Sequence, residues 1–300
     1  MEDVVQKIII DKKYENKKLD KVISMLFPKL SYNSLCKAFR KKDIRVNGNH
    51  CKSSYIVASG DVVSIYIIDA ILFGKTENSD MSHFFDIVYQ DDNLLIVNKM
   101  QGISVHNDST NDNYTLINII RKNLALPNAM LCHRLDRNTG GLILIAKNIQ
   151  TLDLLTNKIK NNEIKKYYKC LVYGNPHNKK ATLHGYLFKN KKLSRVFIKD
   201  TPSKNTLEII TRYKLLSTSQ NTSLLEIELL TGRTHQIRAH MSHIGLPIIG
   251  DGKYGMNKIN KQFSYKFQAL WAYKVIFKFS DNNHLSYLNN KVFEVVPNFV

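Results

Sequence analysis

The chain lacks several features that would place a protein in a simple class. Its four cysteines include no Cys-x-x-Cys pair, so neither a zinc ribbon nor a disulfide framework is indicated. No run of about eighteen apolar residues, the length of a membrane-spanning helix, is present. The first residues also lack the charged-then-apolar layout of a secretory signal. We therefore expect a protein of the reducing cytoplasm with no role in the membrane.

The composition is unusual in its charge. The 300 residues include 44 Lys and Arg against 25 Asp and Glu, a net charge of +19. Such an excess favours a polyanionic partner, with nucleic acid as the first candidate and an acidic membrane surface as the second. A general preference for lysine codons is the alternative explanation. Hydrophobic residues make up 43% of the chain, which argues against intrinsic disorder.

Two helices and several short strands are predicted near the start of the chain. Apolar residues recur at helical spacing over 19–27 and stop at Pro28. Ser31 is placed to cap a second helix. A strand over 44–46 runs into Asn47-Gly48, a strong hairpin dipeptide. These elements predict a small α+β module.

Basic side chains gather on the second helix and the following strand, namely Lys37, Arg40, Lys41 and Arg45. Such a stripe can follow a phosphate backbone, although most charge runs are solvated helix faces. Residues 1–69 resemble an S4-type RNA-binding domain, on the basic helix, the Asn-Gly hairpin and the segment 58–63. The resemblance implies RNA contact by the four basic residues.

The remainder of the chain begins with a polar segment and continues with predicted strands and helices. Residues 70–83 are polar and are predicted to form a linker. A hairpin is predicted over 87–97, and helices are predicted over 115–126 and 150–160. We expect residues 84–300 to form a separate domain.

The densest group of polar residues is His133-Arg134-Leu135-Asp136-Arg137, which precedes an apolar run typical of a buried strand. A carboxylate among cations is expected to be ionised, because opposite charges lower its pKa. Taken alone, an aspartate that fixes a loop through salt bridges is as good an interpretation as a catalytic one.

A second group spans 230–241 and contains Arg233, His235 and Arg238. The histidines at 235, 240 and 243 match no zinc template, and two arginines among them would repel a cation. We therefore predict no metal site here.

A third segment, 165–174, has the alternation of a strand, which places Tyr168, Cys170 and Val172 on one face. A buried tyrosine in a sheet usually serves packing, but it can also stack on a base.

Together these segments resemble the RluA family of pseudouridine synthases, and within it the RluC-like enzymes of large-subunit rRNA. The match covers nearly the whole chain, and the His-Arg-Leu-Asp-x-x-Thr motif followed by Gly-Arg-Thr-His-Gln-Ile-Arg is highly specific. The resemblance implies that Asp136 is the catalytic aspartate, Tyr168 the active-site tyrosine and Arg238 the partner of the aspartate. It further implies that Arg134 fills the place of a flipped base beside the RNA-contacting residues His133, Arg233 and Ile237.

The resemblance also implies a fold and a reaction. The expected fold is α+β: the S4-type module and a catalytic domain with a central mixed, largely antiparallel sheet. The reaction converts uridine to pseudouridine without redox change, so no cofactor and no metal are expected. The expected partner is RNA, 23S rRNA before tRNA, and the expected state is a monomer.

The chain departs from the family pattern at four positions. Gly140 stands where serine is usual, Met100 replaces proline, Trp271 replaces histidine, and Leu246 replaces a frequent histidine. Two alternatives from other classes follow: a non-catalytic RNA-binding protein of ribosome assembly that retains the fold, and a hydrolase using His133 and Asp136. The hydrolase lacks a serine or cysteine nucleophile elbow, although Cys132 is adjacent.

Overall fold

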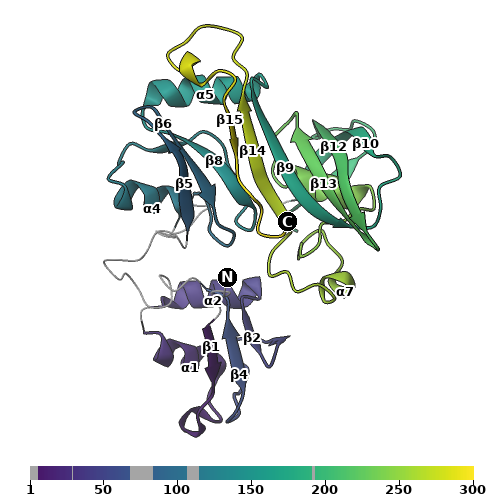
Figure 1. Ribbon diagram of the computed structural model, residues 1–300. Coiled ribbons are helices and arrows are strands. Elements are labelled where there is room, and N and C mark those ends of the chain that lie inside the picture. Colours follow the sequence, from purple (N-terminus) through teal and green to yellow (C-terminus); the bar gives the residue numbers. More distant parts are fainter. Residues whose placement is uncertain (1–5, 29, 68–83, 107–114, 191–192) are drawn as a thin grey trace. The chain divides into compact units, whose positions relative to one another are not determined.

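The computed structural model describes residues 6–28, 30–67, 84–106, 115–190 and 193–300. The chain divides into two compact units, residues 1–80 and 81–300 (Figure 1). The linker predicted over 70–83 lies outside the described residues.

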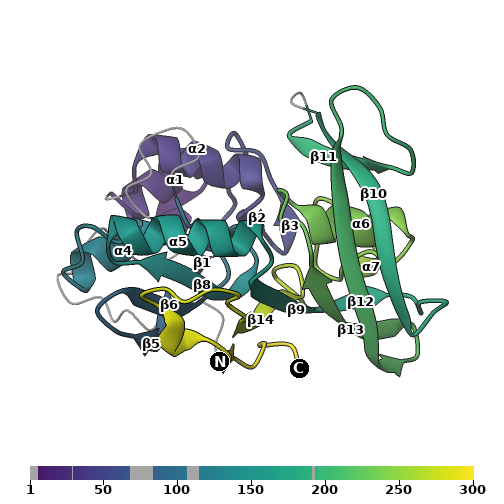
Figure 2. The same ribbon diagram turned by 90° about the horizontal axis from the view of Figure 1, so that it is seen from above.

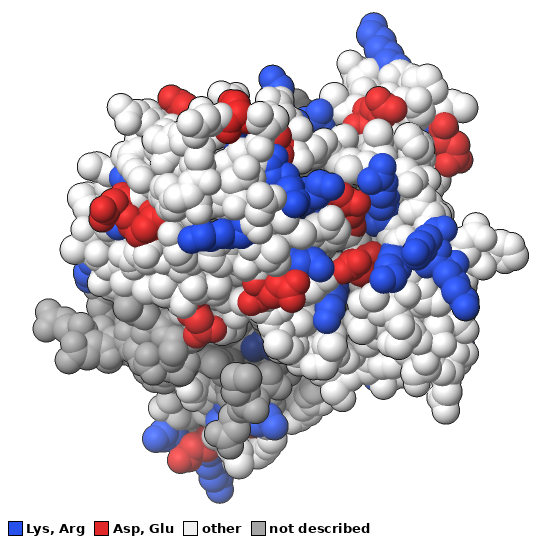
Figure 3. Space-filling model, turned by 45° about the horizontal axis from the view of Figure 1, so that its top comes forward, with Lys and Arg blue, Asp and Glu red and all other residues white. Residues whose placement is uncertain are grey.

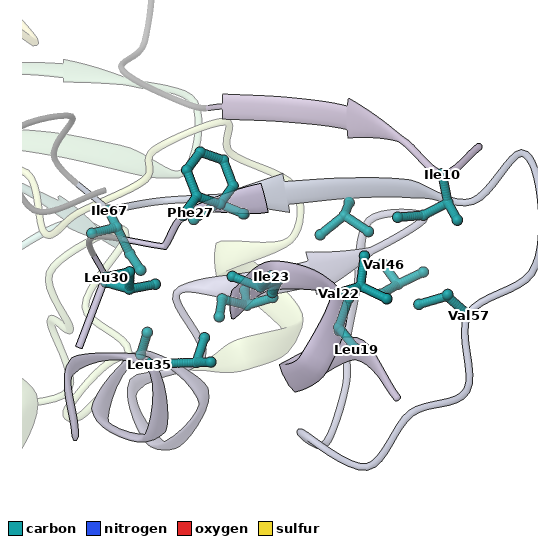
Figure 4. Packing of buried hydrophobic residues seen from close by; sticks show 14 residues of the cluster. Ile10, Leu19, Val22, Ile23, Phe27, Leu30, Leu35, Val46, Val57 and Ile67 are labelled. Carbon is teal, nitrogen blue, oxygen red and sulfur yellow. The ribbon is translucent and has the colours of Figure 1, made fainter. Parts of the chain in front are cut away.

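The first unit combines two helices with an antiparallel sheet of strand order β1-β4-β2-β3. Its elements are β1 (Gln6–Ile9), α1 (Leu19–Leu26), α2 (Tyr32–Lys41), β2 (Ile44–Val46), β3 (Asn49–His50) and β4 (Val62–Ile65). Side chains from both helices and the sheet form one core, which includes Leu19, Val22, Ile23 and Leu35 (Figure 4).

Two local signals in the sequence determine this arrangement. The Ser31 side chain accepts a hydrogen bond from the Ser34 backbone N–H and caps α2. Asn47 and Gly48 both adopt positive φ, 49° and 78°, as the tight turn between β2 and β3 requires. The predicted helices and hairpin are therefore confirmed.

The second unit is built on an 11-stranded sheet, with a main path of β11-β10-β12-β13-β9-β14-β8-β6-β5. Neighbouring strands are antiparallel except β14 and β8, which pair in parallel. The strands are β5 (Phe85–Gln90), β6 (Leu94–Lys99), β7 (Met130–Leu131), β8 (Gly140–Ala146), β9 (Ile164–Tyr173), β10 (Lys180–Asn190), β11 (Arg195–Lys199), β12 (Leu207–Ser219), β13 (Thr222–Leu229), β14 (Leu270–Phe277) and β15 (Val292–Glu294). This mixed, largely antiparallel sheet confirms the expected α+β fold.

The helices of this unit are α4 (Leu116–Asn123), α5 (Ile149–Lys160), α6 (Gln236–His243) and the short α7 (Asn257–Asn260). In α5, Leu155 is buried against Leu142 and Leu144 of β8, so this helix covers part of one sheet face (Figure 2). In α6, Ala239 packs with Val196 of β11 and Ile209 of β12. Within the described part of the chain, no helix is long and apolar enough to cross a membrane.

Candidate active site

The Asp136 loop, residues 132–139, lies between β7 and β8. The order of the strands in the sheet determines which side chains lie near this loop. Strand β14 pairs with β8 on one side and with β9 on the other, so Tyr168 of β9 lies two strands away from the loop that precedes β8. The Asp136 carbonyl accepts a hydrogen bond from the Thr139 N–H at 3.1 Å, which closes a turn at the start of β8.

Asp136 forms an ion pair with Arg238, which lies 102 positions later in the first turns of α6. The Arg238 Nη1 donates to Asp136 Oδ2 at 2.7 Å. The Arg238 side chain is only 9% exposed, whereas that of Asp136 is 23% exposed. The nearby carboxylates raise the pKa of the Arg238 guanidinium above its ordinary value despite burial. The arrangement thus presents a carboxylate that is open to solvent on one side and paired with a fixed cation on the other.

Asp251 holds the opposite edge of the same guanidinium. Arg238 Nε donates to Asp251 Oδ2 at 2.7 Å, and Nη2 donates to Oδ1 at 3.0 Å. Asp251 is completely buried, and the Lys253 and Tyr254 N–H groups also donate to it. Burial opposes ionisation, but these hydrogen bonds and the Arg238 charge hold the Asp251 pKa below its ordinary value.

A cleft of about 420 Å³ opens in front of this ion pair. Its lining includes all seven site residues predicted in the second unit: His133, Arg134, Asp136, Tyr168, Arg233, Ile237 and Arg238. Arg134 and Arg233 are exposed at the cleft, whereas Tyr168 and Ile237 are buried. Three segments far apart in the sequence therefore contribute to one concave site.

Tyr168 lies in the inner part of this cleft with its side chain 5% exposed. Its neighbours Cys170 and Val172 are buried on the same face of β9, as the alternation predicts. Burial, and secondly the negative charge of Asp136, raise the Tyr168 pKa above its ordinary value of 10. The phenol is therefore protonated at neutral pH.

His133 has a role within the fold that the sequence does not reveal. Its Nε2 accepts a hydrogen bond from the Leu144 N–H at 3.1 Å, which ties the Asp136 loop to β8. Burial, together with the positive charge of Lys166, lowers the His133 pKa to about 3. His133 is therefore neutral, and its Nε2 is already used by the protein itself.

His235 is a site residue for which the sequence predicts no role. It precedes α6 in a left-handed conformation, φ 55°. The Tyr254 hydroxyl accepts from the Val196 N–H at 3.0 Å and lies 2.9 Å from His235 Nδ1. His235 Nε2 lies 3.9 Å from Asp136 Oδ1. Burial lowers the His235 pKa to about 4, so the ring is neutral at pH 7.

Lys99 anchors the Asp136 loop from behind. This lysine is fully buried at the end of β6, and its Nζ donates to the backbone carbonyls of Met100, Ile103 and Arg137 at 2.9 to 3.1 Å. Burial lowers the Lys99 pKa to about 7, while Asp136 acts in the opposite direction. The hydrogen bond to the Arg137 carbonyl links β6 directly to the residue that follows Asp136.

The four RNA-contacting residues predicted in the first unit lie on its second helix and the following strand. Lys37, Arg40 and Lys41 lie on α2, and Arg45 lies on β2 with its guanidinium 5.0 Å from the centre of the Tyr66 ring. On the face of the molecule drawn in Figure 3, Lys and Arg side chains form a band that also holds Asp and Glu. The net charge therefore does not form one continuous basic surface on that face.

Comparison with known proteins defines the class. The family model of RNA pseudouridylate synthase matches residues 93–243, a range that contains the Asp136 loop, Tyr168 and Arg238. The chain thus belongs to the RNA pseudouridylate synthases, which are isomerases acting on RNA, and the family resemblance of the sequence is confirmed.

Individual relatives are similar to the chain over most of its length. It is 33% identical over 260 residues to the ribosomal large subunit pseudouridine synthase C of Buchnera aphidicola, covering 84% of this chain and 82% of the relative. It is 34% identical to synthase D of the same organism, over 87% of this chain and 81% of the relative. Among solved structures, human RNA pseudouridylate synthase domain containing 1 has a TM-score of 0.57 at 22% identity, over 73% of this chain and 92% of that one. This last likeness supports the fold.

Proposed function

We propose that this protein converts specific uridines of large-subunit ribosomal RNA to pseudouridine in the cytoplasm, as a monomer, with Asp136 as the reacting carboxylate. The observation that carries the proposal is the 2.7 Å pair of Asp136 and Arg238 at the wall of a cleft. The names of the relatives, which are large-subunit synthases C and D, support the choice of RNA.

The proposed reaction is an isomerisation, and it consumes no second reactant. The N1–C1′ bond of uridine breaks, the uracil turns, and C5 bonds to C1′. C5 loses its proton and N1 gains one, so atoms and electrons balance without a cofactor. Asp136 attacks the sugar or the base, or removes a ribose proton to give a glycal. Each route begins with an ionised carboxylate, which the Arg238 charge favours.

The remaining cleft residues fit the handling of a flipped base. Extruding a nucleotide from its stack costs a few kcal/mol. Arg134 is exposed at the cleft, and a planar guanidinium in the vacated place recovers part of that cost by stacking. Tyr168, protonated and buried, offers a ring face that holds the uracil while it turns.

Mapping of pseudouridine in RNA tests this function. RNA that lacks these modifications is treated with wild type or with Asp136→Asn, followed by carbodiimide adduct formation and primer extension. We expect new stops in large-subunit rRNA with wild type only, while Asp136→Asn binds RNA within a few-fold of wild type. Stops in tRNA would instead assign a tRNA substrate. RNA binding without stops would favour an assembly protein, and turnover by Asp136→Asn would refute the role of the carboxylate.

We infer that the first unit is an S4-type domain that contacts RNA phosphates through Lys37, Arg40, Lys41 and Arg45. Each phosphate contact contributes roughly 0.7 to 0.9 to the slope of log affinity against log salt. Replacing Lys37, Arg40 and Lys41 together by Gln in the full chain should therefore lower this slope by about 2. Unchanged slope and affinity would show that α2 is an ordinary solvated face.

A further inference from the structure

Lys166 is a cation in the cleft for which the proposed mechanism has no use. It precedes Tyr168 by two residues on β9, so both side chains belong to the same face of the strand, and both line the cleft. Within the residues that the structure describes, no carboxylate forms an ion pair with the Lys166 Nζ. Its pKa is lowered to about 8 by burial alone, so the ammonium is still mainly charged at pH 7.

The surroundings of this ammonium are strongly positive. The charged side chains that line the cleft are those of Arg134, Asp136, Lys160, Lys166, Arg233 and Arg238. Asp136 is the single carboxylate in this set, and Arg238 already pairs with it at 2.7 Å. The cleft therefore holds an excess of positive charge that a bound anion would neutralise.

Gly232 lies beside the Lys166 ammonium and places no side chain over it. A Cβ built on Gly232 would lie 3.9 Å from the Lys166 Nζ, and no other atom would approach it within 4 Å. A side chain at position 232 would therefore cover the ammonium from this side. The exposed glycine and the unpaired lysine together leave space for a ligand oxygen.

We propose that the Lys166 ammonium binds a backbone phosphate of the RNA strand that presents its uridine to Asp136. This inference rests on the proposed function, since it takes RNA as the occupant of the cleft. A phosphate carries a full negative charge in the bound substrate, whereas the uracil is neutral until its glycosidic bond breaks. A lysine ammonium is a compact point charge suited to such a contact. The contact also offsets the cost of burying an unpaired cation.

The strand offers a matched control. Lys165 neighbours Lys166 but lies on the opposite face of β9, 43% exposed and 4.0 Å from Glu228. Lys165→Met removes the same charge from the same strand without touching the cleft. Lys166→Arg keeps the charge and should retain the contact, whereas Lys166→Met removes it.

The first experiment measures RNA affinity against salt concentration, and the single-turnover rate at saturating RNA, for full-length wild type and these three variants. We expect Lys166→Met to weaken binding about tenfold and to lower the log–log slope by roughly 0.7 to 0.9, with the saturated rate within threefold of wild type. Lys166→Arg should restore most of the affinity, and Lys165→Met should change neither quantity beyond twofold. Thermal melting of each variant establishes that it is folded.

The second experiment locates the phosphate. A short RNA spanning the mapped uridine is made with one phosphate at a time replaced by neutral methylphosphonate. For wild type, one position should cost about tenfold in affinity, and the same replacement should cost Lys166→Met less than twofold. If none of the phosphate positions shows this coupling to Lys166, the proposal is overturned.

Other outcomes separate this proposal from the function on which it rests. A fall in the saturated rate with an unchanged salt slope would mean that Lys166 acts on the uracil rather than on a phosphate. Unchanged binding and rate would reduce Lys166 to a packing role. If wild type binds RNA with the Lys166-dependent slope but makes no pseudouridine, the proposed reaction fails while the phosphate contact stands.

Discussion

Gly140 and Trp271 are complementary in shape. They are paired across the parallel junction of β8 and β14, and a Cβ on residue 140 would lie 2.3 Å from Trp271 Cζ3. The indole Nε1 donates to Asn98 Oδ1 at 3.2 Å, which fixes the ring over the glycine. The residues at these two positions thus form one packing arrangement, in which the glycine leaves room for the large indole ring.

Substitutions at this pair should therefore be coupled. Gly140→Ser forces the indole to move and should lower the free energy of unfolding by about 1 to 3 kcal/mol, as overpacking does. Trp271→His leaves a cavity and should cost about 2 kcal/mol or more. The double variant should cost at least 1 kcal/mol less than the sum. Urea unfolding of the four proteins measures the coupling, and strictly additive losses would contradict it.

Asp251 should act on the reaction through Arg238 without touching the substrate. Asp251→Asn replaces one hydrogen-bonding carboxylate oxygen by an NH2 group and removes the negative charge. Of the two carboxylates that pair with Arg238, only that of Asp136 then remains. Because breaking a buried ion pair costs about 3 to 5 kcal/mol, we expect lower stability and a 10- to 100-fold lower single-turnover rate. RNA affinity should change little, since Asp251 is completely buried. Equal losses in affinity and rate would mean that the whole cleft has collapsed.

The same substitution gives a pH test. The Asp251 pKa lies below its ordinary value of 3.8, so the native state binds the proton more weakly than the unfolded chain. Its stabilising contribution is complete above pH 3.8 and is lost as the pH falls through the native pKa. Asp251→Asn should therefore flatten the acid limb of a stability–pH curve measured by urea unfolding. A parallel downward shift of the curve at all pH values would contradict this.

The sequence predicted local features well because their causes are local. The Ser31 cap, the Asn47-Gly48 turn and the alternation around Tyr168 depend on neighbouring residues, and the structure confirms each. The predicted cleft residues were found through a family motif, and the structure brings them to one cleft. No rule of spacing links Asp136 to Arg238.

What the sequence did not reveal depends on tertiary burial. Asp251, Lys99 and Lys166 are ordinary charged residues in the sequence, and their roles follow from what surrounds them after folding. Lys99 donates to three backbone carbonyls. Those of Met100 and Ile103 follow its own strand, and that of Arg137 lies 38 positions later in the sequence. Asp251 lies between two glycines in the sequence, but the burial that makes it a partner of Arg238 is visible only in the fold.

Tyr168 should act mainly through its ring. Its phenol forms no hydrogen bond to the described residues, and its buried ring lies on the cleft wall. Tyr168→Phe should retain at least a tenth of the single-turnover rate, whereas Tyr168→Ala should lose a further tenfold or more, because it removes the stacking surface. Equal losses in both variants would assign the function to the hydroxyl instead.

Lys99 should couple loop stability to pH. Its native pKa of about 7 lies below the ordinary 10.5, so between these values the unfolded chain binds a proton that the native chain does not. Stability should therefore rise as pH increases from 7 to 10.5. Lys99→Met should lose this part of the rise while Lys165→Met keeps it, as measured by urea unfolding at pH 6.5, 8 and 9.5.

Lys99→Met should also slow the reaction, although Lys99 is completely buried. The substitution removes the Lys99 donor from the carbonyls of Met100, Ile103 and Arg137. The Arg137 carbonyl keeps the Gly102 N–H as a donor, whereas each buried carbonyl left unsatisfied costs about 1 to 3 kcal/mol. The loop then relaxes, and Asp136 loses its alignment with Arg238. We expect a rate loss of tenfold or more at saturating RNA with affinity retained, because no RNA contact is removed. An unchanged rate in a destabilised variant would show that Arg238 alone is enough to position Asp136.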